Sequence, residues 1–379
     1  MAIEKINIEK FLELADQLPV IDVRSPGEYG HAHIPGAYNL PLFTDEERKI
    51  VGTVYKQESR EQAIKIGLDF FGPKMRKMVE EVEKIISNKQ QAISNRGNAN
   101  GNVPLPIANC LLLYCWRGGM RSAGIAWLMD LYGFKVYTLT GGYKKFRNHV
   151  LDTFKLPFQF KILGGYTGSG KTEMLKALEK QGEFVVDLED IAKHKGSAFG
   201  KLGMIKQPTQ EMFENLLAQK LNEIAKKKSE ARNNGSDMRI ATWLEDESQR
   251  IGDINIPHLL WRRMRQSPVY FLEIPFEERL RHIVEEYSKY DKETLLSCID
   301  RIKERLGGLE TKNAIAFLNE DNYIESFRIL LKYYDKWYFK SLHNREDINS
   351  LLSIISYEKI DIQHPDLFIR QIEQKALSA

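Results

Sequence analysis

The chain has 379 residues, of which 42% are hydrophobic and 28% charged, and its formal net charge is +3. This length predicts two domains, each long enough to bury its own core, and the composition is that of a globular protein in water. The weak net charge excludes a globally cationic surface, so a nucleic acid would have to bind local basic patches.

The first 150 residues predict an α/β domain. Apolar runs at 19–24 and 110–115 have the length of buried strands, and an amphipathic helix follows the second run and ends at Gly133. A further strand at 135–139 completes a strand–helix–strand unit, which implies a parallel sheet with a right-handed crossover.

Two stretches of unusual composition divide the chain. Residues 87–106 are rich in Asn, Gln and Gly, and they predict an exposed, mobile insertion loop in the first domain. Pro157 marks the boundary after residue 150. Beyond it we expect a P-loop α/β domain core at 158–275, and a helical C-terminal part at 276–379 that packs on this core.

A cysteine opens the loop between the strand at 110–115 and the next helix. The amides of a tight loop form an anion nest, the helix adds the positive end of its dipole, and two arginines add charge. Each effect favours thiolate over thiol, so we predict that Cys115 is a nucleophile toward a sulfur, selenium or phosphorus centre. The predicted anion loop comprises Trp116, Arg117, Gly118, Gly119, Met120 and Arg121.

The cysteines and the hydropathy favour a cytoplasmic location. Cys110, Cys115 and Cys298 form no disulfide framework and lack zinc-ligand spacing, so reduced thiols are expected. No apolar run approaches the ~18–20 residues of a membrane span, and the first residues lack the apolar core of a signal peptide. We therefore expect no membrane partner.

The stretch "GYTGSGKT" at 165–172 fits the phosphate-binding P-loop in full. An apolar strand precedes it and a helix follows, which is the context that this motif requires. Lys171 supplies a charge to the terminal phosphate, and Thr172 can coordinate Mg²⁺. The predicted diphosphate-binding residues are Gly165, Gly168, Ser169, Gly170, Lys171 and Thr172.

Carboxylates follow two strands near this loop, at 183–190 and 239–248. A strand-end carboxylate holds the Mg²⁺ water shell in nucleotide-hydrolysing P-loop proteins. Asp246 and Asp187 are therefore candidates, with Asp246 favoured, although such charges also solvate strand ends. We assign no metal ligand from the sequence and leave a Mg²⁺ requirement open.

Three stretches mix basic residues with glycines or aromatic rings, at 193–208, 261–267 and 333–341. Each on its own is typical of a solvated face or a core stripe. Together they favour an RNA partner, since proteins bind RNA with basic side chains that hold its phosphates and aromatic rings that stack on its nucleobases.

Residues 19–41 resemble the first signature of the rhodanese family, and "VYTLTGGY" at 136–143 resembles its closing strand and turn. The resemblance implies that Cys115 is the active-site cysteine, which carries a persulfide in that family. Two features depart from the pattern. Ala32 stands where rhodaneses usually have Gly, and Arg121 makes the loop one residue longer, a length found in rhodanese-like phosphatases.

The order of the two motifs points to a narrower family. "YCWRGGMRSAG", "GGYTGSGKT" and "WLEDESQRIGDINIP" together resemble the tRNA 2-selenouridine synthases over nearly the whole chain. The resemblance implies a transferase that replaces the sulfur of wobble 2-thiouridine in tRNA with selenium from selenophosphate, through an S-geranyl intermediate made from geranyl diphosphate. It also implies an S-selanylcysteine at Cys115, a P-loop that binds the prenyl diphosphate, no tightly bound cofactor, and a selenophosphate-supplying enzyme as a further partner.

Other classes of protein remain open from the residues alone. One is a sulfurtransferase fused to an NTP-dependent small-molecule kinase, which would bind ATP and would not need tRNA. Another is a rhodanese-like phosphatase, which the longer loop favours. A third is a non-catalytic sensor in which the rhodanese domain binds an anion.

Overall fold

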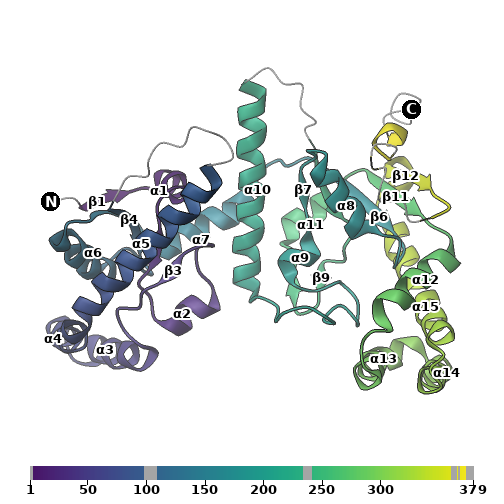
Figure 1. Cartoon of the computed structure of the whole chain (residues 1–379), viewed down its shortest axis with the longest axis horizontal. Helices are drawn as coiled ribbons and strands as arrows, with labels where there is room; N and C mark the ends of the chain where they lie inside the picture. Colours follow the sequence, from purple (N-terminus) through teal and green to yellow (C-terminus); the bar gives the residue numbers. More distant parts are fainter. Residues whose placement is uncertain (1–2, 98–108, 234–240, 360–364, 366–367, 373–379) are drawn as a thin grey trace. The chain divides into compact units, whose positions relative to one another are not determined.

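The computed structural model describes residues 3–97, 109–233, 241–359, 365 and 368–372 (Figure 1). The chain divides into two compact units, Met1–Asp152 and Thr153–Ala379, which are treated separately below. Each unit is an α/β structure with a parallel sheet, as the sequence predicts. In the described part of the chain, no helix has the length and apolar character needed to cross a membrane.

The first unit is built on a five-stranded sheet in the order β1-β5-β4-β2-β3, with every neighbouring pair parallel. Strand β4 lies at the centre and is buried along its whole length, as expected for a strand covered on both faces. The carboxyl ends of β2 and β4 lie side by side and carry the cysteine loop. The strands are β1 (Ile3–Ile6), β2 (Val20–Asp22), β3 (Tyr38–Asn39), β4 (Cys110–Tyr114) and β5 (Lys135–Leu139).

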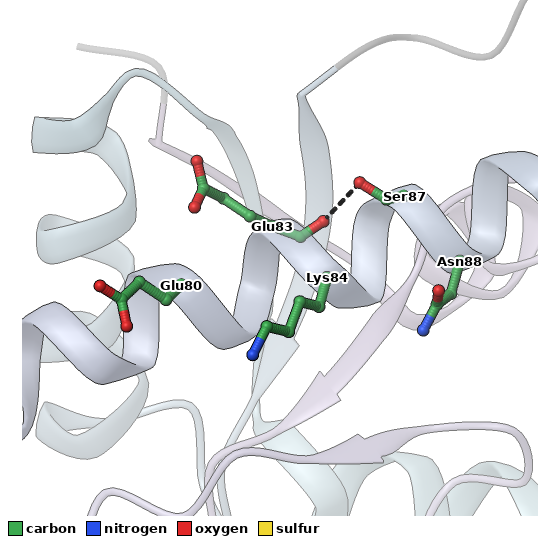
Figure 2. Close-up of a pocket in the computed structure, with 5 residues that line it drawn as sticks. All are labelled: Glu80, Glu83, Lys84, Ser87 and Asn88. Atoms are coloured by element: carbon green, nitrogen blue, oxygen red, sulfur yellow. Dashed lines mark hydrogen bonds between the residues drawn. The ribbon is translucent and has the colours of Figure 1, made fainter.

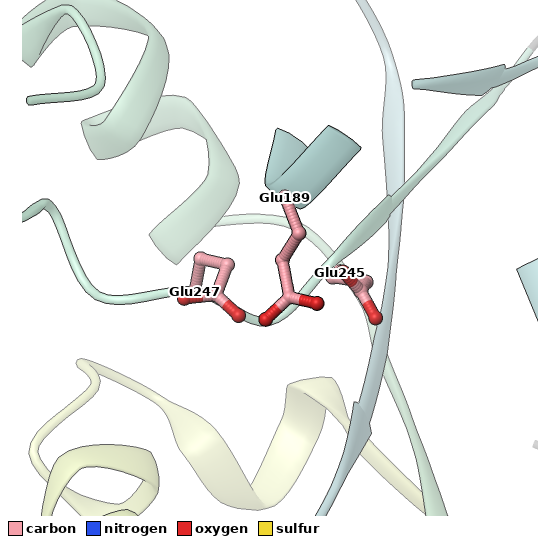
Figure 3. A group of neighbouring side chains, drawn as sticks. All are labelled: Glu189, Glu245 and Glu247. Atoms are coloured by element: carbon pink, nitrogen blue, oxygen red, sulfur yellow. The ribbon is translucent and has the colours of Figure 1, made fainter. Parts of the chain in front are cut away.

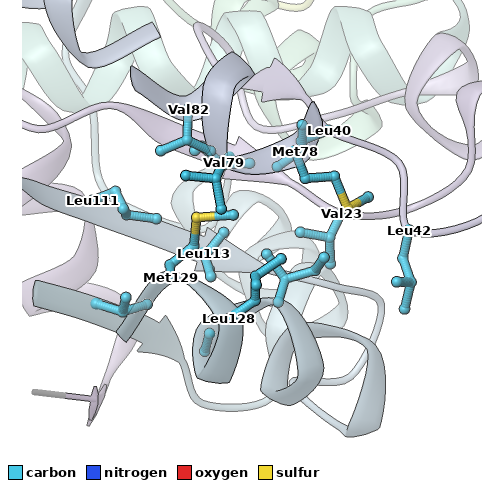
Figure 4. Close-up of a cluster of buried hydrophobic side chains, with 14 of the residues drawn as sticks. Val23, Leu40, Leu42, Met78, Val79, Val82, Leu111, Leu113, Leu128 and Met129 are labelled. Carbon is cyan, nitrogen blue, oxygen red and sulfur yellow. The ribbon is translucent and has the colours of Figure 1, made fainter. Parts of the chain in front are cut away.

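Helices cover this sheet and bury its apolar side chains. The core joins β2 and β4 to α5 and α6, with Val23, Leu111, Val82 and Met129 in one cluster (Figure 4). Gly133 ends α6 in the left-handed conformation, at φ 105°, as predicted. The helices are α1 (Ile8–Ala15), α2 (Pro26–His31), α3 (Asp45–Gln57), α4 (Arg60–Phe71), the 3₁₀ turn η1 (Gly72–Lys74), α5 (Met75–Gly97), α6 (Met120–Tyr132) and α7 (Gly142–Thr153).

The prediction of a loop at 87–106 is wrong for its first part. Helix α5 continues to Gly97, so residues 87–97 are helical. The composition misled because the core residues of α5, such as Val79, Val82 and Ile86, lie in the turns that precede this polar stretch. The remainder of the predicted loop, 98–106, lies outside the described residues.

The second unit has a five-stranded parallel sheet in the order β12-β11-β6-β8-β7. Strand β6 is central, so the loop that follows it emerges where its neighbours β11 and β8 also end, which is where parallel sheets bind ligands. A short antiparallel hairpin, β9–β10, follows β8. The strands are β6 (Phe160–Gly165), β7 (Val185–Val186), β8 (Thr242–Glu245), β9 (Arg250–Ile251), β10 (Ile254–Asn255), β11 (Val269–Glu273) and β12 (Leu352–Ser356).

The helical C-terminal part is largely as predicted, with one exception. Helices α12 to α15 share a core that includes Ile283, Leu295, Ala314 and Phe327. The exception is β12, which pairs with β11 and so belongs to the sheet. The helices are α8 (Lys171–Lys180), α9 (Leu188–Ala192), α10 (Gln210–Asn233), α11 (His258–Arg265), α12 (Phe276–Tyr287), α13 (Lys292–Leu306), α14 (Gly308–Asn319), α15 (Tyr323–His343) and α16 (Ile348–Leu351).

Candidate functional site

Cys115 lies at the carboxyl end of β4, and its sulfur is held by groups of the loop that follows. The thiol is buried, with 3% of the residue exposed. Its Sγ accepts a hydrogen bond from the Gly119 amide at 3.3 Å and lies 3.2 Å from the Ser122 hydroxyl. The Ser122 hydroxyl also donates to the Gly119 carbonyl at 3.0 Å, so it links the sulfur to the loop backbone. Ser122, on the first turn of α6, is a site residue that sequence reasoning missed.

The predicted closing turn packs directly against the cysteine loop. The amide of Tyr143 donates to the Cys115 carbonyl at 2.8 Å, and the amide of Lys144 donates to the Trp116 carbonyl at 3.0 Å. Gly142 has φ 59°, and a Cβ there would lie 2.3 Å from the Cys115 carbonyl oxygen. Only glycine permits this approach, so the Gly-Gly turn fixes the path of the loop.

The two arginines of the loop have different surroundings. Arg117 is exposed, as are Trp116 and Met120. The Arg121 guanidinium instead forms a forked ion pair with Glu28 of α2, with distances of 2.6 and 3.4 Å. Although partial burial acts in the opposite direction, the hydrogen bond and charge of Arg121 lower the pKa of Glu28, so the pair is ionised at neutral pH. Arg121 is therefore oriented by Glu28, a residue of the signature at 19–41 whose ion pair with Arg121 was not predicted.

A buried polar network lies beneath this loop. Arg24 is 1% exposed, and its Nη2 donates to Asp22 Oδ2 at 2.6 Å and to the Ala32 carbonyl at 2.7 Å. The Tyr114 hydroxyl donates to the same aspartate at 2.7 Å, and the Arg24 guanidinium lies 3.8 Å from the centre of the Tyr143 ring. Arg24 thus links Asp22 of β2, Tyr114 of β4 and Tyr143 of α7, so the network positions the cysteine loop.

The P-loop of the second unit joins β6 to α8 in the predicted strand–loop–helix arrangement. Lys171 Nζ donates to the carbonyls of Gly165 at 2.9 Å and Tyr166 at 3.4 Å, so its ammonium group lies within the P-loop. Gly168 has φ 78°, and a Cβ there would lie 2.7 Å from Ile283 of α12. The Ser169 hydroxyl is buried and has no hydrogen-bond partner among the described residues, so it is free to bind a ligand.

The structure places Glu245, and not Asp246, beside the P-loop hydroxyl. The Thr172 hydroxyl donates to Glu245 Oε1 at 3.0 Å. Asp246, the favoured candidate from the sequence, instead accepts the Tyr338 hydroxyl at 2.8 Å and pairs with Arg345. Asp187 caps α9, where its side chain accepts the Asp190 amide at 2.8 Å.

Three glutamates converge near Thr172 (Figure 3). Glu189 of α9, Glu245 of β8 and Glu247 each offer one carboxylate oxygen, and these oxygens lie within 4.8 Å of one another. Burial raises the pKa of all three carboxyls, and repulsion from Glu245 adds to the shift of the other two. All three lie among the strand-end carboxylates at 183–190 and 239–248 that the sequence indicated, although Asp246 and Asp187 were favoured over them.

The P-loop and the three glutamates line one pocket of about 460 Å³. Its other wall is mostly apolar and aromatic, formed by Ile283 and Tyr287 of α12 and by Tyr334 and Trp337 of α15. A hollow along α5, shown in Figure 2, is lined by residues of that helix alone, and none of them is a predicted site residue. The pocket therefore joins the P-loop and three carboxylates to a wall that is mostly apolar and aromatic.

These features define a two-site protein in which a rhodanese-like cysteine loop precedes a P-loop domain. The model of the rhodanese-like domain matches residues 7–149, and the model of the "tRNA 2-selenouridine synthase AAA domain" matches residues 158–353. The chain belongs to the tRNA 2-selenouridine synthase family.

Individual relatives match the chain over most of its length. The tRNA 2-selenouridine synthase of Hydrogenovibrio crunogenus is 33% identical, over 87% of this chain and 90% of that protein. The enzyme of the same name from Bdellovibrio bacteriovorus is 31% identical, over 91% and 94%. Among solved structures, the N-terminal domain of a putative ATP/GTP binding protein from Clostridium difficile 630 is 36% identical, covering 39% of this chain and 99% of that one, with a TM-score of 0.32.

Proposed function

We propose that the protein is a cytoplasmic transferase that replaces the sulfur of 2-thiouridine in tRNA with selenium, in two steps. Membership of the family supports the overall reaction. The division into two steps is supported by the presence of two different sites in one chain. The first unit has a thiol that is hydrogen-bonded by its loop, and the second has a P-loop pocket with an apolar wall.

The P-loop pocket is assigned to the first step, geranyl transfer. The thiocarbonyl sulfur attacks the carbon bonded to the diphosphate, a carbon–sulfur bond forms, and the carbon–oxygen bond breaks to release diphosphate. The P-loop amides and Lys171 would stabilise the leaving group, because charge accumulates on its oxygens in the transition state. Ile283 supports this assignment, since its apolar side chain lines the same pocket as the P-loop residues.

The cysteine loop is assigned to the second step, in which selenium replaces the alkylated sulfur. The carbon–sulfur bond of the base breaks, geranyl thiol leaves, and a carbon–selenium bond forms. The phosphorus–selenium bond of selenophosphate is replaced by a phosphorus–oxygen bond from water. Cys115 is proposed to hold selenophosphate in the loop through contact of its sulfur with selenium and without a sulfur–selenium bond, so selenium stays at the selenide level until it attacks the base. The Gly119 amide and the Ser122 hydroxyl would keep this sulfur in place.

The acidic residues of the P-loop pocket fit a divalent cation. Glu245 is 1% exposed, and its Oε2 has no hydrogen-bond partner among the described residues. A buried carboxylate oxygen without a partner is costly, and a cation would satisfy it. Thr172, Glu245, Glu189 and Glu247 would hold Mg²⁺, which would neutralise charge on the departing diphosphate.

Binding of Mn²⁺ as a probe for Mg²⁺ tests the cation site without an activity assay. Glu245→Gln keeps the acceptor for Thr172 but removes the charge, so we expect Mn²⁺ affinity to fall at least about tenfold. The measurement is the electron paramagnetic resonance signal of free Mn²⁺ during titration of the purified protein. Asp187→Asn is the matched control and should bind as the parent does. Equal affinity of the parent and Glu245→Gln would contradict the site.

The whole reaction is tested by the mass of the modified nucleoside. Purified protein is incubated with tRNA that carries 2-thiouridine, first with geranyl diphosphate and then with selenophosphate. We expect the mass of one geranyl group to be gained and then lost as selenium replaces sulfur. Phosphate release from aryl esters or ATP consumption, with the nucleoside unchanged, would instead support the phosphatase or kinase alternative.

A further inference from the structure

Helix α15 brings an exposed indole to the mouth of the P-loop pocket. Trp337 lines this pocket and is 44% exposed. The next residue, Tyr338, fixes the helix to the phosphate loop, because its hydroxyl accepts the Gly165 amide at 3.1 Å and donates to Asp246 at 2.8 Å. The position of Trp337 is therefore tied to the place where a diphosphate would bind.

The surroundings of Trp337 leave part of its ring open. The Tyr333 ring meets it edge-on, with 6.4 Å between ring centres, and Lys340 Nζ lies 5.4 Å from the ring centre. The deeper apolar wall is supplied by Ile283, which contacts Gly168, and by the buried Tyr287. A prenyl chain thus has its own surface in the pocket, and Trp337 offers a flat face at the entrance.

Positive charges follow the same helix. Lys332, Lys336 and Lys340 are exposed and recur every four residues, which places them about 6 Å apart along α15. Arg265 of α11 donates two hydrogen bonds of 3.1 Å to the Ser341 carbonyl, which brings a further charge to the end of this row. A basic row beside an aromatic ring is the combination that binds single-stranded RNA, with phosphates on the charges and a base on the ring.

We propose that Trp337 stacks on the nucleobase to be alkylated and that Lys336 and Lys340 hold the flanking RNA phosphates. This assignment rests on the proposed function, because the base has to reach the carbon bonded to the diphosphate at the P-loop. A tRNA anticodon would then enter the pocket along α15, with the unstacked base at the mouth and the prenyl chain against α12.

Kinetics of geranyl transfer to an anticodon stem-loop that carries 2-thiouridine test the stacking role. We expect Trp337→Ala to raise KM for the stem-loop about tenfold, because base–aromatic stacking is worth ~1–3 kcal/mol. Trp337→Phe should recover most of the loss. The dissociation constant of geranyl diphosphate, measured by calorimetry, should stay near the parent value. Phe339→Ala is the control, since Phe339 is exposed on the same helix but packs on His343.

Three results would overturn the assignment. An unchanged KM for the stem-loop in Trp337→Ala would remove the stacking role. Weakened binding of geranyl diphosphate with an unchanged KM for RNA would assign Trp337 to the prenyl chain instead. Absence of geranyl transfer by the parent protein would overturn the proposed function and, with it, this assignment.

The salt dependence of stem-loop binding tests the lysine row independently. Each neutralised phosphate contributes about 0.7 to the slope of log K against log salt for single strands. Lys336→Ala/Lys340→Ala should therefore lower the magnitude of the slope by about 1.4. Lys303→Ala/Lys312→Ala, which removes two exposed lysines from α13 and α14, should leave it unchanged. Equal slopes in both double variants would contradict the phosphate contacts.

Discussion

Replacement of Cys115 with alanine should abolish selenium incorporation into geranylated tRNA, by more than about 10³-fold, while geranyl transfer continues. The reason is that the only group altered is the sulfur that accepts the Gly119 amide, in the first unit, whereas the P-loop pocket is formed by the second unit. Single-turnover assays of each step, followed by nucleoside mass spectrometry, measure the two activities separately.

Cys110→Ala is the matched control for this variant. Cys110 is also a buried thiol, but it is the first residue of β4 and so lies at the opposite end of the strand from the loop. Burial raises the pKa of its thiol, which makes it a poor nucleophile. Cys110→Ala should therefore retain both activities. Loss of both activities in a folded Cys115→Ala protein would contradict the proposed division of labour.

Replacement of Lys171 with alanine should slow geranyl transfer by about 10²–10³-fold, the range expected for removal of one preorganised charge at a leaving group. Lys171 Nζ lies within 2.9 Å of the Gly165 carbonyl, inside the loop that would hold the diphosphate. The measurement is the single-turnover rate of S-geranyl formation with saturating geranyl diphosphate. Selenium incorporation into tRNA that already carries the geranyl group should proceed at the parent rate.

Lys180→Ala is the control for the P-loop variant, because Lys180 is an exposed lysine in the last turn of the same helix. It should transfer geranyl at the parent rate. Unchanged geranyl transfer in Lys171→Ala would remove the P-loop from this step. If ATP binding were lost in that variant while prenyl transfer persisted, the kinase alternative would explain the motif better.

The features that could be predicted from the sequence are local ones. The P-loop and the cysteine loop are each a strand, a short turn and a helix, so their residues are brought together by consecutive backbone geometry. Gly168 and Gly142 have positive φ at the positions where those turns require it. The two-domain α/β architecture follows from the same alternation of apolar runs and amphipathic segments, and the structure confirms it.

The features that were missed depend on pairing between distant segments. Glu245 faces Thr172 because β8 pairs with β6 in a register that sets Glu245 opposite Leu163. Asp246, the favoured candidate from the sequence, follows this strand and lines the same pocket, but its carboxylate accepts the Tyr338 hydroxyl and pairs with Arg345. The ion pair between Glu28 and Arg121 joins residues 93 positions apart, and nothing local in the sequence identifies it.

Because strand β12 comes late in the chain, the sheet of the second unit is completed only near the end of synthesis. Strand β12 covers the edge of β11, and β11 in turn pairs with β6, the strand that leads into the P-loop. The ribosome therefore releases the phosphate-binding segment long before the last strand of its sheet exists, and β11 offers an unpaired edge during that interval. A nascent chain that stalls before residue 352 would expose this edge of β11 to other chains. Pairing of β12 with β11 therefore prevents self-association through that edge.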